Sequence, residues 1–102
     1  MREAHERREP VVYIMASGRN GTLYVGVTSN ICERAWQHRT GRVTGFTKRY
    51  GCRFLVWYEH HDRIDDAIAR EKQIKAGSRI KKLALIEASN AGWRDLYEDF
   101  VP

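Results

Sequence analysis

One carboxylate in this chain of 102 residues falls on the apolar stripe of an expected helix. Ile64, Ala67, Ile68 and Ile74 recur at helical spacing, and Glu71 falls in the same series. A carboxylate that faces a core is costly unless it is paired with a cation or binds a metal. The position of Glu71 therefore indicates either a metal ligand or one half of an ion pair with a nearby Arg or Lys.

Two short apolar runs, residues 11–15 and 23–27, lie on either side of a loop rich in turn formers. Ser, Gly, Arg, Asn and Gly fill positions 17–21 between them. This pattern predicts a β-hairpin. Pairing Ser17 with Thr22 would leave a loop of four residues and would fix the register of both strands.

In that register, Tyr13 and Tyr24 fall on the same face of the hairpin, diagonal to each other. Gly26 shares this face and could let a ligand approach the backbone closely. The alternative is that both tyrosines are ordinary residues of a half-buried strand. The opposite face is apolar throughout and suits a core; it carries Val12, Ile14, Ala16, Leu23, Val25 and Val27.

A helix is expected over residues 31–40, because Asn30 followed by Glu33 resembles a capping box. Arg34 and His38 are four residues apart in this helix and therefore neighbours on its surface. Considered on its own, Arg34 is best explained as a surface cation and His38 as a half-buried histidine whose polar atoms are satisfied.

Taken in chain order, these residues resemble the motifs of the GIY-YIG nuclease superfamily. Val11-Val12-Tyr13 and Tyr24-Val25-Gly26 resemble the two halves of its name motif, with Val11 in the place of Gly. Residues 34–38 resemble the family's helix with an Arg and, four residues on, a His or Tyr. Residues 69–73 resemble the segment with its metal-binding Glu. The resemblance runs from residue 11 to about residue 97.

The resemblance is closest to small free-standing bacterial members, through the segments 46–51 and 93–97, and it extends to the N-terminal nuclease domain of excinuclease C. It implies an α+β fold, with a three-stranded antiparallel sheet flanked by helices in the order β-β-α-β-α-α. It also implies a metal-dependent endonuclease that hydrolyses phosphodiester bonds in DNA, structure-selectively, in DNA repair or processing.

The implied roles follow the matching positions. Glu71 would bind Mg²⁺ or Mn²⁺, and Tyr13 or Tyr24 would be the general base. Arg34 would hold the phosphate, and His38 would position or protonate the reacting groups. The alternative is a nucleic-acid-binding module of the same fold with weak or lost activity, because this chain departs from the family pattern. Many members have Lys directly after the second motif, where this chain has Val27 and Thr28. Many also have an Asn on the later helix, where this chain has Leu83, and Asn90 is only a loose substitute.

Basic residues gather in two blocks that contain no acid, within a formal net charge of +5. Residues 34–58 hold six Lys or Arg and residues 72–86 hold five, which together are 11 of the 18 basic residues. This segregation indicates a basic face suited to nucleic acid, and the family resemblance implies DNA rather than RNA. A protein-interaction adaptor would leave both blocks unexplained. The cations expected to contact nucleic acid are Arg39, Arg42, Lys48, Arg49, Lys72 and Lys75.

Phe46 and Tyr50 alternate with cations in the Gly-rich segment 41–51. Aromatic rings among cations suit base stacking beside phosphate contacts. The two rings could equally anchor the segment to the core, and the sequence favours neither alternative.

Composition fits one globular domain, with 42% hydrophobic residues. We expect a flexible arm over residues 1–9 and a single domain over 10–102. No apolar run reaches the length of a membrane span, and the Arg/Glu-rich start is unlike a signal peptide. We therefore expect a cytoplasmic protein in which Cys32 and Cys52 are reduced thiols.

The remaining elements are predicted by local patterns. Near-continuous apolarity predicts a central strand over residues 53–59. Asp62 is expected to cap the helix that carries Glu71, and Ser78 to cap a further helix over residues 79–88. Residues 93–97 are expected to pack back as a short turn.

Overall fold

The computed structural model describes residues 9–42 and 45–100, so most of the expected N-terminal arm lies outside the described residues. The predicted α+β order is confirmed, with two short helical segments added. The elements are β1 (Val11–Ala16), β2 (Leu23–Thr28), α1 (Ile31–Arg39), α2 (Phe46–Arg49), β3 (Phe54–His60), α3 (Ile64–Ala76), α4 (Arg79–Ser89) and the 3-10 helix η2 (Leu96–Phe100). No helix in the described ranges is long and apolar enough to cross a membrane.

The hairpin has the predicted register. The Ser17 amide donates to the Thr22 carbonyl at 3.0 Å and closes the four-residue loop. Tyr13 consequently lies opposite Gly26, and Tyr24 lies two residues along, opposite Met15. Both tyrosines therefore lie on one face of the sheet, as the parity of the two strands requires.

The three strands are antiparallel in the order β2-β1-β3, so the central strand is β1. The prediction that the strand near residues 53–59 is central is wrong. All six residues of β1 are buried, whereas β3 begins and ends with exposed residues. The apolar run in β3 reflects helices packed over both faces of its middle, which a sequence pattern cannot distinguish from a position between two strands.

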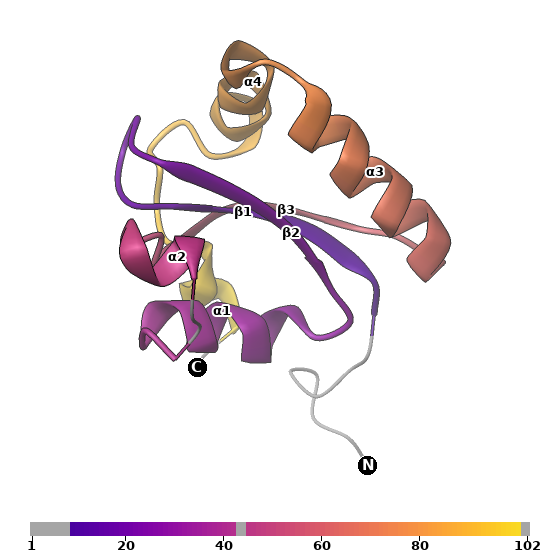
Figure 1. Ribbon diagram of the computed structural model, residues 1–102, viewed down its shortest axis with the longest axis horizontal. Coiled ribbons are helices and arrows are strands. Elements are labelled where there is room, and N and C mark those ends of the chain that lie inside the picture. The colour runs from indigo at the N-terminus through magenta and orange to yellow at the C-terminus, as the bar shows by residue number, and fades with distance from the viewer. Residues whose placement is uncertain (1–8, 43–44, 101–102) are drawn as a thin grey trace.

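Helices cover both faces of the sheet (Figure 1): α3 and α4 lie on one side, and α1, α2 and η2 on the other. The first side holds the predicted core, which includes Val12, Ile14 and Val25 and is closed by Ala67 and Ile86. The tyrosine face holds a second core, which the hairpin pattern did not predict. Its buried members are Val11, Tyr13, Met15, Ile31, Ala35, Cys52 and Leu55.

Two of the three predicted caps are confirmed. The Asn30 side chain accepts a hydrogen bond from the Glu33 amide at 3.1 Å, and the Ser78 hydroxyl accepts one from the Lys81 amide at 3.3 Å. The predicted cap at Asp62 is wrong, because α3 begins after Arg63, whose side chain makes no cap bond. Two acidic residues in the first turn of α3 complement its helix dipole instead.

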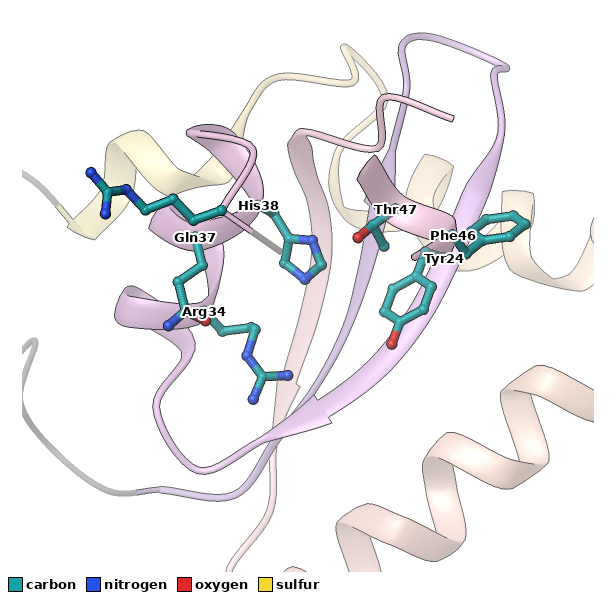
Figure 2. Close-up of a pocket in the computed structure, with 7 residues that line it drawn as sticks. Tyr24, Arg34, Gln37, His38, Phe46 and Thr47 are labelled. Atoms are coloured by element: carbon teal, nitrogen blue, oxygen red, sulfur yellow. The ribbon is translucent and has the colours of Figure 1, made fainter. Parts of the chain in front are cut away.

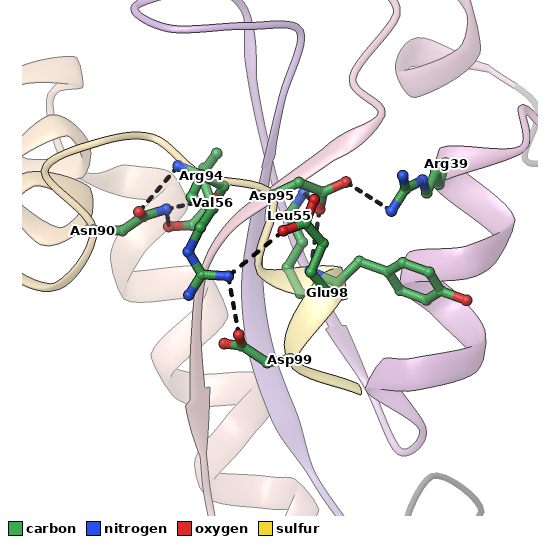
Figure 3. A network of polar contacts seen from close by, with 9 residues as sticks. Arg39, Leu55, Val56, Asn90, Arg94, Asp95, Glu98 and Asp99 are labelled. Atoms are coloured by element: carbon green, nitrogen blue, oxygen red, sulfur yellow. Dashed lines mark hydrogen bonds and ion pairs between the residues drawn. The ribbon is translucent and has the colours of Figure 1, made fainter. Parts of the chain in front are cut away.

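The segment after α4 returns to β3 and α1 through a polar network (Figure 3). Asn90 donates to the carbonyls of Val56 and Arg94 at 3.1 and 2.8 Å, and its side-chain oxygen accepts from the Arg94 amide at 3.0 Å. Asp95 accepts from the Leu55 amide at 3.2 Å and pairs with Arg39 of α1 at 3.3 Å. These bonds tie the end of the chain to the helix that carries Arg34 and His38.

Candidate active site

A buried hydroxyl is the centre of the site. Tyr13 on β1 is fully buried, and its Oη accepts a hydrogen bond from Arg34 Nη1 at 3.3 Å. The same oxygen lies 3.2 Å from His38 Nε2. Because Arg34 and His38 are one helical turn apart on α1, both side chains reach the same phenol. The structure therefore brings together three of the predicted catalytic residues.

Gly26 makes room for this arrangement. A Cβ built at Gly26 would lie 2.5 Å from Cζ and Oη of Tyr13, and real Cβ atoms do not approach other atoms so closely. The suggestion that Gly26 admits a ligand to the backbone is therefore wrong for this structure, because the Tyr13 ring occupies that space. Gly26, from the second half of the motif, therefore leaves room for the ring of Tyr13, from the first half.

Burial governs the ionisation of this cluster. It raises the pKa of Tyr13 to about 12 and outweighs the hydrogen bond and charge of Arg34, which lower it. It also lowers the pKa of His38 to about 4, with a further decrease from the Arg34 charge. At neutral pH, Tyr13 is therefore a phenol and His38 a neutral imidazole.

The other ring nitrogen of His38 is unusual. Nδ1 is buried and has no hydrogen-bond partner among the described residues. Buried polar atoms without partners are rare in folded proteins and cost stability. Since Arg34 donates to the Tyr13 oxygen, the phenolic hydrogen is free to point at His38 Nε2, which leaves the imidazole hydrogen on the unpartnered Nδ1.

A cavity of about 450 Å³ opens beside this cluster, between α1 and the strand β2 (Figure 2). Arg34 and His38 face it from α1, and Tyr24 faces it from β2. The Tyr24 ring centroid lies 6.3 Å from that of Tyr13 and 5.8 Å from that of His38. The lining residues are Tyr24, Arg34, Gln37, His38, Arg42, Phe46 and Thr47. Among the described residues, the lining includes two guanidinium groups and no carboxylate, so it suits an anion.

Glu71 lies on α3, and its side chain is 14% exposed, as its place in the apolar series predicts. Its carboxylate pairs with Lys75 at 2.9 Å, so the ion-pair alternative is the one that the structure contains. The Lys75 ammonium also lies 5.9 Å from the Tyr24 ring centroid. The negative charge of Glu71 reaches Tyr13, whose pKa it raises slightly.

The donor set around Glu71 decides whether a metal fits. Within the described ranges there is no group of three or more His, Cys, Asp or Glu that could hold a metal ion. A single carboxylate nevertheless suits Mg²⁺, which keeps several waters and takes further oxygen ligands from a substrate phosphate. The ammonium that now pairs with Glu71 belongs to Lys75, whose flexible side chain is 50% exposed and can move aside. Glu71 therefore fits a hydrated Mg²⁺ or Mn²⁺.

The six cations predicted to contact nucleic acid are all exposed, but they do not share one place. Arg42 lines the cavity and stacks on Trp36 at 5.0 Å, and Lys75 lies beside Tyr24. Arg49 stacks on Tyr50 at 5.6 Å. Arg39 points the other way, to Asp95 and to the Tyr97 ring at 5.2 Å. Lys48 and Lys72 lie on the exposed sides of α2 and α3.

Two residues of the lining were missed by the sequence analysis. Gln37 follows Arg34 by three positions on α1, so helical spacing could have placed it beside the predicted site. Thr47 is buried in α2, a helix that the Gly-rich composition of its segment concealed.

The hairpin, the helix-borne Arg and His, and the carboxylate on a later helix belong to one small α+β domain whose elements follow the expected order. Residues 9–84 match the GIY-YIG catalytic domain, and the chain belongs to the GIY-YIG family. The resemblance found in the sequence is thereby confirmed.

The chain is similar to small bacterial UPF0213 proteins. It is 37% identical over 75 residues to one from Staphylococcus saprophyticus, covering 74% of this chain and 90% of the relative. It is 36% identical over 76 residues to one from Staphylococcus haemolyticus, covering 74% and 92%. The solution NMR structure of a UPF0213 protein from Bacillus halodurans has the same fold, with a TM-score of 0.53 and 25% identity over 85% of this chain and 92% of that one.

Proposed function

We propose that this protein is a metal-dependent endonuclease that cleaves phosphodiester bonds in DNA, structure-selectively, in repair or processing of DNA in the cytoplasm. The observation that carries the proposal is the polar cluster of Tyr13, Arg34 and His38 beside a cavity lined by guanidinium groups. The GIY-YIG catalytic domain supports a nuclease in general. The particular roles below are inferred from the geometry.

Arg34 holds the phosphate in this proposal. Its Nη1 donates a hydrogen bond to the Tyr13 hydroxyl. The guanidinium also lines the cavity, so its other N–H groups can donate to phosphate oxygens. Arg42, on the same cavity wall, can take a second oxygen. Donors fixed before the reaction stabilise the charge that grows on the phosphate in the transition state.

Tyr13 is the proposed general base. Its pKa of about 12 makes the phenol the resting form, so the phenolate must be stabilised when substrate binds. Arg34 already donates to the phenolic oxygen, and the neutral His38 lies within 3.2 Å to receive the proton. Tyr24, whose side chain lines the cavity directly, is the second candidate for the base.

Glu71 is the proposed ligand of Mg²⁺ or Mn²⁺. When bound, such an ion would supply a Lewis acid for a phosphate oxygen. In its absence, Lys75 balances the carboxylate charge.

A second candidate function is nucleic-acid binding without efficient cleavage. Two observations favour it: Glu71 is engaged by Lys75, and the side chain of Asn90 is used entirely by backbone groups. Asn90 therefore cannot supply the late Asn of the family pattern.

The test compares the parent protein with Glu71→Gln on labelled DNA and RNA structures, with and without Mg²⁺ or Mn²⁺. We expect metal-dependent cleavage of a DNA structure to fall by orders of magnitude in Glu71→Gln, while binding stays equal or tightens because a negative charge is removed. Melting of the metal-free variant should change little, since the partner Lys75 is half exposed. A parent that binds DNA but cleaves no substrate with either metal would favour the binding module.

A further inference from the structure

The short helix α2 exposes aromatic rings and buries a polar residue. Phe46 is 47% exposed and Tyr50, its C-cap, is 46% exposed, whereas Thr47 is only 4% exposed. The Thr47 carbonyl also accepts the Cys52 amide at 2.9 Å. Thr47 therefore anchors the segment, and the alternative that Phe46 and Tyr50 anchor it does not hold.

The exposed rings continue a series that begins inside the cavity. The Tyr24 and Phe46 rings are stacked with centroids 6.2 Å apart and planes 30° apart, and Phe46 and Tyr50 follow at 4.6 Å. Arg49 lies over Tyr50, and Lys75 lies over Tyr24 at the other end. We call Phe46 and Tyr50 the aromatic step. Leaving two large adjacent rings half exposed is unfavourable in water and typical of a binding surface.

Charge limits what can bind the aromatic step. Phe46 lines the same cavity as Arg34 and Arg42, and no carboxylate of the described part of the chain lines it. A ligand on the step therefore has an apolar, planar part for the rings and an anionic part for the guanidinium groups. A nucleotide combines these two parts, because every base has a π-face and is joined through its sugar to a phosphate.

We propose that the aromatic step stacks an unpaired base of DNA whose neighbouring phosphate is held at Arg34. This proposal rests on the function proposed above and goes beyond it by naming the substrate class as DNA with an unpaired nucleotide at the site of cleavage. A base inside a duplex is stacked between its neighbours and must leave the helix before it can lie on Phe46. Single strands, gaps and flaps present such a base without that cost.

The test measures binding in the Glu71→Gln background without metal, so that no outcome depends on cleavage. The probes are a single-stranded DNA oligonucleotide containing 2-aminopurine, the same oligonucleotide in a blunt duplex, and its RNA counterpart. Phe46→Ala and Phe46→Leu are compared with Phe54→Ala. Phe54 is a matched control because it is an aromatic residue of similar exposure, 43%, that does not line the cavity.

We expect Phe46→Ala to weaken single-strand binding about tenfold or more and to leave duplex binding nearly unchanged. Phe46→Leu should behave like Phe46→Ala, because it keeps apolar volume and loses the ring. Quenching of 2-aminopurine should decrease in both variants and persist in Phe54→Ala.

Equal affinity of the background protein for single strand and duplex, unaffected by Phe46→Ala, would overturn the stacking proposal and leave the nuclease proposal standing. Tighter binding of the RNA strand than of the DNA strand would overturn the assignment to DNA. Absence of binding to every nucleic acid at low salt would overturn the proposed function itself.

Discussion

Helix α1 takes part in two polar networks that differ in how completely they are satisfied. On one side, Arg34 meets Tyr13 and His38 through two contacts of 3.2–3.3 Å, and His38 Nδ1 has no partner in the described part of the chain. On the other side, Arg39 meets Asp95, whose two oxygens accept two backbone amides and this guanidinium. The first network shifts the pKa of Tyr13 and His38 and leaves a buried ring nitrogen without a partner in the described ranges, whereas both carboxylate oxygens of Asp95 are hydrogen-bonded or ion-paired.

We expect this difference to separate a functional cluster from a structural one. A fully bonded network stabilises one arrangement and gains little from a ligand. A buried cluster with an unpaired atom and shifted pKa values costs stability and is typical of sites that act on a substrate. The Tyr13 cluster should therefore affect activity when it is changed, whereas changes to Asn90, or to the Arg39–Asp95 pair, should affect stability.

The largest expected effect is on cleavage in Tyr13→Phe. The variant keeps the ring that fits over Gly26 and removes only the hydroxyl that Arg34 and His38 contact. If Tyr13 is the general base, cleavage should fall about 10²- to 10⁴-fold in single-turnover assays with metal. Tyr24→Phe is the matched comparison. A larger loss in Tyr24→Phe than in Tyr13→Phe would move the role of the base to Tyr24.

The next effect is a dependence of stability on pH. The pKa of His38 is about 4 in the folded protein and 6.5 as its ordinary value, so between these pH values the unfolded chain binds a proton that the folded protein does not. The contribution of His38 to the free energy of unfolding should therefore be constant above pH 6.5. It should fall as the pH drops from 6.5 to 4 and stay at its reduced value below pH 4. The total loss is about 3 kcal/mol.

Urea unfolding at several pH values measures this loss, and His38→Gln is the control because it has no titrating group. The difference between the two curves isolates His38 from the carboxylates that also titrate in this range. Parallel curves for the parent protein and His38→Gln would contradict the buried neutral imidazole.

A smaller effect is expected at the structural network. Asn90→Ala removes three hydrogen bonds to backbone groups: those to the carbonyls of Val56 and Arg94 and the one from the Arg94 amide. We expect a loss of about 2–3 kcal/mol in the free energy of unfolding. Cleavage per folded molecule should remain near that of the parent protein at a temperature where both are folded. A specific loss of cleavage without a loss of stability would give Asn90 a role at the site.

Local signals predicted much of this molecule. The Ser17–Thr22 pairing fixed the register that places Tyr13 and Tyr24 on one face, and the side chains of Asn30 and Ser78 cap their helices as expected. The apolar series around Glu71 predicted a shielded carboxylate. In the structure this carboxylate forms an ion pair with Lys75, as a shielded charge requires. Each of these depends on residues close together in the chain.

What the sequence did not predict depends on contacts between distant segments. The apolar patterns of β1 and β3 are alike, so the order of strands could not be deduced from them. The second core on the tyrosine face forms only when α1 and η2 pack against it. Phe46 is exposed because Thr47 takes the buried position in α2. The composition of the segment would be the same if Phe46 were buried instead, so it could not decide between the two arrangements.

The smallest expected effect distinguishes two exposed cations that the sequence analysis treated alike. Arg39→Gln removes an ion pair with Asp95 on the side of α1 away from the cavity, whereas Arg42→Gln removes a guanidinium from the cavity lining. Because the Arg39 side chain is 45% exposed, its loss should lower the free energy of unfolding by less than about 1 kcal/mol. DNA affinity should be unchanged in Arg39→Gln and reduced in Arg42→Gln, whose plot of log affinity against log salt should be less steep by about one phosphate contact. Titrations of both variants over a range of salt measure the two slopes. Equal losses of affinity in the two variants would mean that DNA extends around α1 to the Arg39–Asp95 pair, and the separation of the two networks would then fail at this point.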